Sequence, residues 1–180
     1  MKSCQSKYSM WLIPTGKTYE ELRQIIYNLS QRHSSPIFEP HITLIGKLFG
    51  EERDLVEKTR QLAFNVSPFD IRLNGLDLKY SEEYFKSLFI DIEKTPKIIA
   101  ANKKAKQVFN QEDGNYRPHL SLVYGNFPMR LKNEMISEIG DNINLEFRAQ
   151  KIHLFSTYGE VKNWHEVNYS VLGGKNKKTN

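Results

Sequence analysis

The chain has little of several things that would have assigned it to a particular class of protein. It contains one cysteine, Cys4, in 180 residues, which excludes an internal disulfide and a zinc site built from cysteines. No apolar run approaches the ~20 residues that span a bilayer, so we expect no membrane segment. The first seven residues lack the apolar centre of a secretory signal peptide. By default, we therefore expect a cytoplasmic protein.

A strong net charge is also missing. The chain has 26 Lys and Arg against 21 Asp and Glu, a net charge of +5, and three of the positive charges lie within residues 175–180. This mildly basic composition is compatible with an anionic ligand. It lacks the clustered Lys and Arg residues that are typical of a protein that binds a long stretch of nucleic acid. The hydrophobic fraction of 39% is enough for a packed core. We expect a single domain over residues 1–174, followed by a basic flexible tail at 175–180.

The patterns that are present alternate between strands and helices. Apolar and alternating runs predict strands over residues 7–13, 41–48, 69–80, 84–92, 119–124, 145–157 and 166–172. Apolar residues at helical spacing predict helices over residues 18–33, 51–65, 95–108 and 128–139. Thr18 and Glu21 form a capping-box pattern. Thr95 before Pro96 is a second helix start. Because hairpins and helices are mixed, we expect an α+β fold with mainly antiparallel sheets and outer helices.

Two short strings in the chain are near copies of each other. They are Pro40-His41-Ile42-Thr43-Leu44 and Pro118-His119-Leu120-Ser121-Leu122, with the histidines 78 positions apart. Residues i and i+2 of a strand share a face, so each string would present one imidazole and one hydroxyl together. If the two strands lie side by side, one pocket holds two titratable bases and two short hydrogen-bond donors. That set suits acid–base chemistry on a phosphate.

The residue types suggest a division of labour in such a pocket. Histidine titrates near pH 6.5, so one imidazole can be neutral while the other is protonated. His41 and His119 are therefore the candidate catalytic residues, and Thr43 and Ser121 the candidate phosphate-binding donors. The sequence leaves open which histidine is the base and which is the acid.

The strings and their surroundings resemble the 2H phosphoesterase superfamily, and most closely its cyclic phosphodiesterase branch. The matching segments are residues 8–14, 38–43, 116–124, 84–89, 95–96 and 164–167. The resemblance covers nearly the full chain apart from its polar termini. The chain departs from the pattern in cysteine content, since members carry several cysteines and this chain has only Cys4.

The resemblance implies a bilobal fold in which each lobe contributes one motif to a central groove. It also implies hydrolysis of nucleoside 2′,3′-cyclic phosphates or ADP-ribose 1″,2″-cyclic phosphate, with neither a metal nor a cofactor. By the same resemblance, Trp11, Phe85 and Tyr124 are expected to bind the substrate, although core packing is an equal alternative for the first two. Strict alternation places Tyr124 on the face opposite His119, so it reaches the site only if the strand ends or bulges first. Gly125 offers a reason for such an ending.

The other histidines and cations are expected to be structural or solvent-exposed. His33, His153 and His165 have no hydroxyl partner at the same spacing, and we interpret them as surface or edge residues, with His153 a packed or edge residue of a strand. A zinc site is disfavoured because no H-x-H or H-x-x-x-H spacing is present. Four cations could reach a phosphate but are expected to be solvated surface charges: Lys47, Arg117, Arg130 and Arg148.

Four other functions are compatible with the two strings. A 2′,5′-phosphodiesterase, an RNA 2′,5′ ligase or an RNA 3′-end processing enzyme would use the same motifs on a longer polynucleotide, so RNA ends are the further partner to consider. A non-enzymatic nucleotide- or RNA-binding module would share the fold, but both histidines and both hydroxyls are intact here. We expect a monomer that binds no membrane.

Overall fold

The computed structural model describes residues 8–74, 78–112, 114–140 and 143–174. Its α-helices are α1 (Gly16–His33), α2 (Glu52–Phe64), α3 (Pro96–Val108) and α4 (Met129–Ile139). Its strands are β1 (Tyr8–Leu12), β2 (Ile42–Leu48), β3 (Phe69–Asn74), β4 (Leu78–Tyr80), β5 (Leu88–Asp91), β6 (His119–Val123), β7 (Asn144–Ala149), β8 (Lys151–Ser156) and β9 (His165–Val171). Cys4 and the basic tail at residues 175–180 lie outside the described residues.

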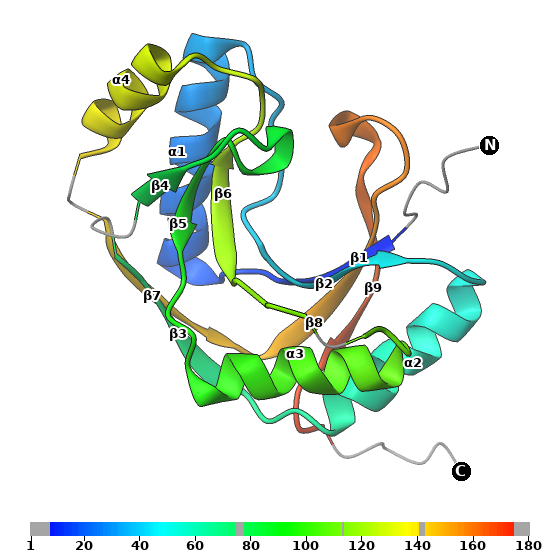
Figure 1. The fold of residues 1–180 in the computed structure, drawn as a ribbon. Coiled ribbons are helices and arrows are strands. Elements are labelled where there is room, and N and C mark those ends of the chain that lie inside the picture. Colours follow the sequence, from blue (N-terminus) through cyan, green and yellow to red (C-terminus); the bar gives the residue numbers. More distant parts are fainter. Residues whose placement is uncertain (1–7, 75–77, 113, 141–142, 175–180) are drawn as a thin grey trace.

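The strands form two antiparallel sheets of unequal size (Figure 1). The larger sheet has seven strands in the order β4-β5-β6-β2-β1-β8-β9, and the smaller one pairs β3 with β7. The pairings within the described residues are antiparallel. The predicted α+β class with mainly antiparallel sheets and outer helices is therefore confirmed.

The large sheet is two half-sheets joined at one seam. Strands β4, β5 and β6 form one half, and β2, β1, β8 and β9 form the other. The seam is the pairing of β2 with β6, through Ile42 and Leu120. Helix α1 packs on β6 and β7, whereas α2 contacts β8 and β9 and α3 contacts β2. Figure 1 shows α1 and α4 beside the first half and α2 and α3 along the second, which gives the expected bilobal arrangement.

The two repeated strings lie on both sides of this seam, and each sends aliphatic side chains into the core. Ile42, Leu44, Leu120 and Leu122 are at most 1% exposed. Because successive strand residues point to opposite faces, this burial turns the alternate positions of each string toward the other face of the sheet. The hydrophobic core thus sets which way the histidines and hydroxyls point.

Side chains, rather than a further strand, complete the hydrogen bonding along the free edge of β2. Beyond Ile42, the Thr43 carbonyl accepts from the Tyr116 hydroxyl at 3.0 Å and the Leu44 carbonyl from Asn102 Nδ2 at 2.7 Å. The Gly46 carbonyl accepts from Gln111 Nε2 at 2.9 Å. These bonds satisfy backbone groups that a splayed neighbour strand leaves unpaired. The two halves can therefore diverge and leave room between them.

The start of α3 is as predicted, whereas the start of α1 is not. Thr95 Oγ1 accepts from the Ile98 amide and Pro96 is the first helical residue. The predicted capping box is wrong, because α1 begins at Gly16 and not after Thr18. The Thr18 hydroxyl instead donates to the Glu146 carbonyl of β7 at 2.6 Å. The Thr18 hydroxyl therefore makes a tertiary hydrogen bond in place of a local helix cap.

Two long predicted strands are each divided between the sheets. Residues 69–80 form β3 in the small sheet and β4 in the large one, with residues 75–77 outside the described part. Residues 145–157 likewise split into β7 and β8. The predicted strand over residues 84–92 begins only at Leu88, because Tyr84–Lys86 forms a short 3-10 helix. The alternation of apolar and polar residues predicts which residues form strands, but not in which sheet each strand pairs.

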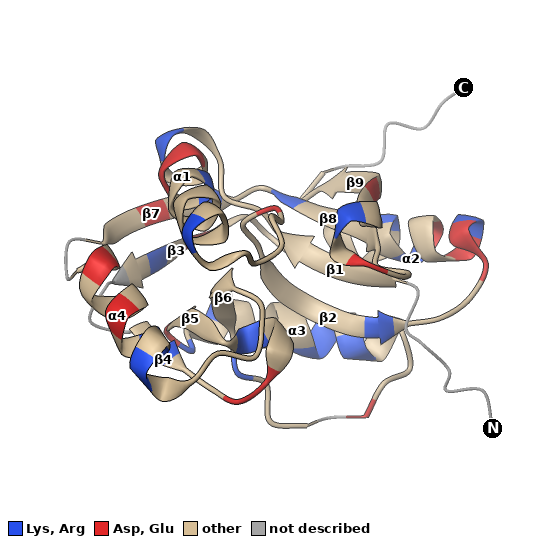
Figure 2. Ribbon diagram, turned by 90° about the horizontal axis from the view of Figure 1, so that it is seen from above, with Lys and Arg blue, Asp and Glu red and all other residues tan. Residues whose placement is uncertain are grey.

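No helix in the described ranges is both long and apolar enough to cross a membrane. Figure 2 shows Lys and Arg interspersed with Asp and Glu on α1 and α2. Along β2 the single charged residue is Lys47, near the end of the strand.

Candidate active site

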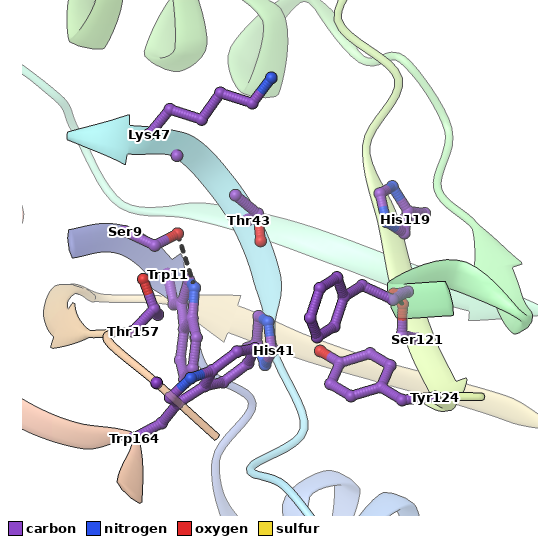
Figure 3. Close-up of a pocket in the computed structure, with 13 residues that line it drawn as sticks. Ser9, Trp11, His41, Thr43, Lys47, His119, Ser121, Tyr124, Thr157 and Trp164 are labelled. Atoms are coloured by element: carbon purple, nitrogen blue, oxygen red, sulfur yellow. Dashed lines mark hydrogen bonds between the residues drawn. The ribbon is translucent and has the colours of Figure 1, made fainter. Parts of the chain in front are cut away.

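A cavity of about 410 Å³ lies where the two half-sheets meet (Figure 3). It is lined by residues from both halves, and these include all four residues of the repeated motif: His41, Thr43, His119 and Ser121. The antiparallel seam pairs Ile42 with Leu120. Among the described residues this is the one pairing between the two strings, and beyond it the strands diverge, with His119 and Ser121 paired to Asp91 and Phe89 of β5 on the other side of β6.

Each of these imidazoles is oriented by the backbone carbonyl two residues before it. His41 Nδ1 lies 2.6 Å from the Glu39 carbonyl oxygen, and His119 Nδ1 lies 3.0 Å from that of Arg117. A carbonyl only accepts, so Nδ1 carries the proton in both rings. The residue between, in each case, is a proline, whose fixed φ helps to present the preceding carbonyl. Both rings therefore have Nε2 as the nitrogen available to a ligand.

His41 is packed among aromatic rings. It is 7% exposed, and it stacks on Trp11 with ring centroids 3.6 Å apart and an interplanar angle of 11°. Phe38 meets it edge-on at 6.3 Å. Burial lowers the pKa of His41 from 6.5 to about 4, against the opposing effect of the Glu39 carbonyl. His41 is therefore neutral near pH 7, with a free lone pair on Nε2.

His119 lies in a more charged environment. Burial lowers its pKa as well, and Lys86 acts in the same direction. The Arg117 carbonyl, Asp91 and Glu83 oppose that shift. Asp91 is the cross-strand partner of His119 on β5 and holds Arg117 through two hydrogen bonds of 2.9 and 2.6 Å. His119 thus has carboxylates that favour its protonated form, whereas none is among the causes of the pKa shift of His41, which the charge of His119 lowers further.

The two hydroxyls differ in what they can donate. The Ser121 hydroxyl, in a residue 5% exposed, donates to the Phe85 carbonyl at 2.9 Å. No hydrogen bond to the Thr43 hydroxyl is recorded within the described residues, and that hydroxyl faces the pocket in Figure 3. Thr43 is thus ready to donate to a phosphate oxygen, whereas Ser121 must first turn away from Phe85.

All three predicted aromatic residues line the pocket, but they present different surfaces to it. Trp11 is 2% exposed and its faces are covered by His41 and by Phe155, whose centroid is 3.9 Å away. Tyr124 stacks on Phe38 at 3.7 Å and turns its hydroxyl toward His41 (Figure 3). Phe85 is 53% exposed, so it offers the open ring face among the three.

Tyr124 reaches the pocket because β6 is irregular and ends before it: Phe89 pairs with Ser121, but its neighbour Leu88 pairs with Val123, so β6 has one extra residue there. The strand stops at Val123, and Gly125 has a φ of 148°, a backbone conformation that favours glycine. The Gly125 amide donates to the Tyr84 carbonyl at 2.9 Å instead of continuing the strand. The sequence analysis required the strand to end or bulge before Tyr124, and the structure meets that condition.

Sequence reasoning missed several residues that line the cavity. Trp164 contacts Phe85 and Tyr124, with ring centroids 5.7 and 6.1 Å away. Ser9 accepts from Trp11 Nε1 at 2.9 Å and fixes the indole. Lys47 lines the cavity too, although it was expected to be a solvated charge. The aromatic segment before β9 was a signal for Trp164, and alternation along β2 was one for Lys47, which lies an even number of residues from His41 and Thr43.

The remaining histidines stay outside the pocket lining. His153 Nδ1 lies 2.6 Å from Glu166 Oε2 between β8 and β9. His165 Nδ1 donates to the Asn163 carbonyl at 3.0 Å. The surface position expected for His33 is wrong, because its side chain is 9% exposed and packs beside Phe127, with Nε2 3.8 Å from Glu138.

The other cations considered from the sequence are paired with carboxylates. Arg117 pairs with Asp91, Arg130 with Glu134 and Arg148 with Asp70. The part of the chain that the structure describes contains no group of three or more His, Cys, Asp or Glu residues that could hold a metal ion.

Comparisons with known proteins give a consistent result. A family model described as "Cyclic phosphodiesterase-like protein" matches residues 7–172. A 2′,3′-cyclic-nucleotide 3′-phosphodiesterase of Kluyveromyces lactis is 26% identical over 184 residues, which cover 87% of this chain and 85% of the relative. A second protein of that name, from Yarrowia lipolytica, is 26% identical over 107 residues, 56% of this chain and 50% of the relative.

Solved structures match the fold at lower identity. The protein TT0787 of Thermus thermophilus superposes with a TM-score of 0.64 at 15% identity, covering 94% of this chain and 99% of that chain. Escherichia coli LigT complexed with 3′-AMP gives a TM-score of 0.60 at 11% identity, covering 92% and 97%. At these identities the likeness concerns the fold alone.

Proposed function

The chain belongs to the cyclic phosphodiesterase-like family, the cyclic phosphodiesterase branch of the 2H phosphoesterases, and from this we propose that it opens nucleoside 2′,3′-cyclic phosphates by two-histidine acid–base catalysis. Membership makes the protein a cyclic phosphodiesterase, an enzyme that hydrolyses cyclic phosphates. One observation carries the mechanism: two imidazoles, each with Nε2 free, line a single cavity.

His41 is the general base in this proposal and His119 the general acid. A pKa of about 4 leaves His41 neutral at physiological pH, able to take a proton from water. The water oxygen attacks phosphorus, the bond from phosphorus to the ribose O3′ breaks, and His119 Nε2 gives its proton to that oxygen. The product is a 2′-phosphomonoester. Each proton transfer of this kind is typically worth ~100-fold to ~10,000-fold in rate.

The hydroxyls and aromatic rings hold the substrate. Thr43 donates to a non-bridging phosphate oxygen, and Ser121 does so once its hydroxyl leaves the Phe85 carbonyl. The open face of Phe85 stacks against the base. Tyr124 contributes its hydroxyl, which stays protonated because burial raises its pKa. Trp11 acts on the substrate only by its edge, since both of its faces are covered.

We propose two cyclic phosphates as substrates, and their turnover can be compared directly. Relatives named for 2′,3′-cyclic nucleotides favour that class; ADP-ribose 1″,2″-cyclic phosphate presents the same five-membered ring and is the second substrate we propose. We also propose that the protein is active as a monomer, which sedimentation at assay concentration would test.

The experiment is a phosphorus NMR assay in EDTA. The enzyme is incubated with 2′,3′-cyclic AMP, ADP-ribose 1″,2″-cyclic phosphate and a 2′,5′-linked dinucleotide. We expect the cyclic compounds to open to phosphomonoesters, 2′-AMP from the first, and the dinucleotide to stay intact. Cleavage of the dinucleotide would favour the 2′,5′-phosphodiesterase. Binding without turnover would favour the non-enzymatic module, and loss of activity in EDTA would refute the metal-independent mechanism.

A further inference from the structure

Lys47 lies on an irregular stretch of β2. Two steps along β1, from Tyr8 to Met10, correspond to three along β2, from Leu48 to Ile45, and the next step, from Met10 to Trp11, corresponds to two, from Ile45 to Thr43. The first irregularity lies at Gly46 and Lys47, and the two together keep the buried Ile45 off the pocket face while Thr43 and Lys47 share it. Bulges redirect side chains and are frequent beside active sites. Regular alternation from Thr43 would have required Ile45, which is buried, to share the pocket face.

The backbone at Lys47 is unusual for its residue type. Its φ is 55°, in the left-handed region, which is unfavourable for a residue that carries a Cβ atom. The Gln111 side chain holds this conformation, because its amide donates to the Gly46 carbonyl at 2.9 Å and to the Lys47 carbonyl at 3.3 Å. A strained residue persists where its surroundings fix it, and such residues gather at ligand sites.

Lys47 also carries the one ammonium group among the residues that line the cavity, and none of these residues is Asp or Glu. No ion pair is recorded for it within the described residues. An ammonium at the edge of a pocket without a carboxylate suits an anionic group on the ligand.

The position of Lys47 separates it from the reacting phosphate. It lies four residues beyond Thr43 on β2, at most ~13 Å along the strand. In Figure 3 its ammonium lies at the end of the pocket away from Tyr124 and Trp164. If the base stacks at the aromatic end and the cyclic phosphate lies between the histidines, the remaining end of the pocket receives the 5′ side of the ribose.

We propose that Lys47 forms a subsite for a phosphate on the 5′ oxygen of the ribose that carries the cyclic phosphate. This inference rests on the proposed function, and it deepens it by naming the substrate class: cyclic phosphates with a second phosphate group. Two sources share this chemistry. One is the diphosphate of ADP-ribose 1″,2″-cyclic phosphate, and the other is the last internucleotide phosphate of an RNA ending in a cyclic phosphate.

The test compares two substrates that differ by one phosphate: adenosine 2′,3′-cyclic phosphate and its 5′-phosphorylated form. We expect the wild-type kcat/KM to be about 10-fold higher for the phosphorylated compound, the value of a charge-assisted hydrogen bond. Lys47→Met, which keeps the length of the side chain, removes the preference, so kcat/KM falls by about 10-fold more on the phosphorylated substrate than on the unphosphorylated one. Lys47→Arg keeps the preference. Lys103→Met, on the exposed face of α3, is the matched control for the change in net charge, and this variant retains the preference for the phosphorylated substrate.

An equal preference in the wild type and Lys47→Met would overturn the subsite, as would an equal loss on both substrates. ADP-ribose 1″,2″-cyclic phosphate and a dinucleotide with a terminal cyclic phosphate then distinguish the two sources by which one loses more in Lys47→Met.

A binding arm separates this inference from the proposed function. Calorimetry with 2′-AMP and adenosine 2′,5′-bisphosphate measures the effect of the second phosphate without any turnover. Tighter binding of the bisphosphate that disappears in Lys47→Met supports the subsite even if no cyclic phosphate is opened. Identical affinity for both compounds in the wild type refutes it.

Discussion

The two imidazoles of the pocket are oriented by short, local geometry. Each Nδ1 donates to a carbonyl two residues earlier, across a proline. A pattern this local can be recognised in the sequence, so His41 and His119 and their hydroxyl neighbours were found there. The ring stacked beneath His41 could not be predicted, because Trp11 reaches it across the β1–β2 pairing.

The Trp11 indole is expected to act through His41. Replacing it in Trp11→Leu removes the stacked ring and admits water, so the pKa of His41 should rise toward 6.5. The acid limb of the kcat/KM profile should move with it, and kcat should fall by up to ~10-fold, the upper value of an aromatic pair. Trp11→Phe should retain most of both. Thermal unfolding of each variant checks the core, where such truncations cost ~3–5 kcal/mol. A rise in KM with kcat and the pH profile unchanged would instead assign Trp11 to the substrate.

The Thr43 and Ser121 hydroxyls should respond differently to removal. Thr43→Val deletes a free donor and should lower kcat by about 10-fold or more, as expected for a bond to a charged oxygen. Ser121→Ala removes the hydrogen bond to the Phe85 carbonyl. It should chiefly raise KM, because the segment that carries the Phe85 ring is then held less firmly. Steady-state kinetics on 2′,3′-cyclic AMP separates the two. Equal falls in kcat, with KM constant, would show that Ser121 donates to the phosphate as directly as Thr43.

At the scale of elements, β2 is the strand on which the site depends. It pairs with β1 along one edge and is completed by side chains along the other. Tyr116 lies just before the second string, and its hydroxyl donates to the Thr43 carbonyl in the first string. Local signals predicted β2 and the cap of α3, but the two register shifts that keep Ile45 off the pocket face depend on the pairing with β1 and could not be predicted from the alternation.

Removing the Tyr116 hydroxyl should weaken both stability and catalysis. Tyr116→Phe leaves the Thr43 carbonyl without its donor, which costs ~1–3 kcal/mol for a buried group. Urea unfolding should show this loss, and kcat should fall because the strand that carries Thr43 loses an anchor. Tyr27→Phe, at a tyrosine 47% exposed, serves as the control. Unchanged stability and turnover in Tyr116→Phe would contradict a role for this link.

For the whole molecule, the divergence of two half-sheets from one seam produces the cavity. The fold class could be predicted because hairpin and helix signals are local. The assignment of β3 and β7 to a separate sheet could not, since it is decided by pairing between residues about 75 apart. We propose that both halves form one domain over residues 1–174, because the site needs a motif from each.

The pH dependence of kcat/KM in the wild type, His41→Ala and His119→Ala tests the central claim most directly. His41 must be deprotonated to accept a proton, so activity falls on the acid side near its pKa of about 4. His119 must be protonated to donate one, and its lowered pKa places the alkaline limb below 6.5. We predict a bell-shaped wild-type profile, loss of the acid limb in His41→Ala and of the alkaline limb in His119→Ala, each with a fall of ~100-fold or more. Wild-type rates in both variants, or an unaltered bell in either, would contradict the account.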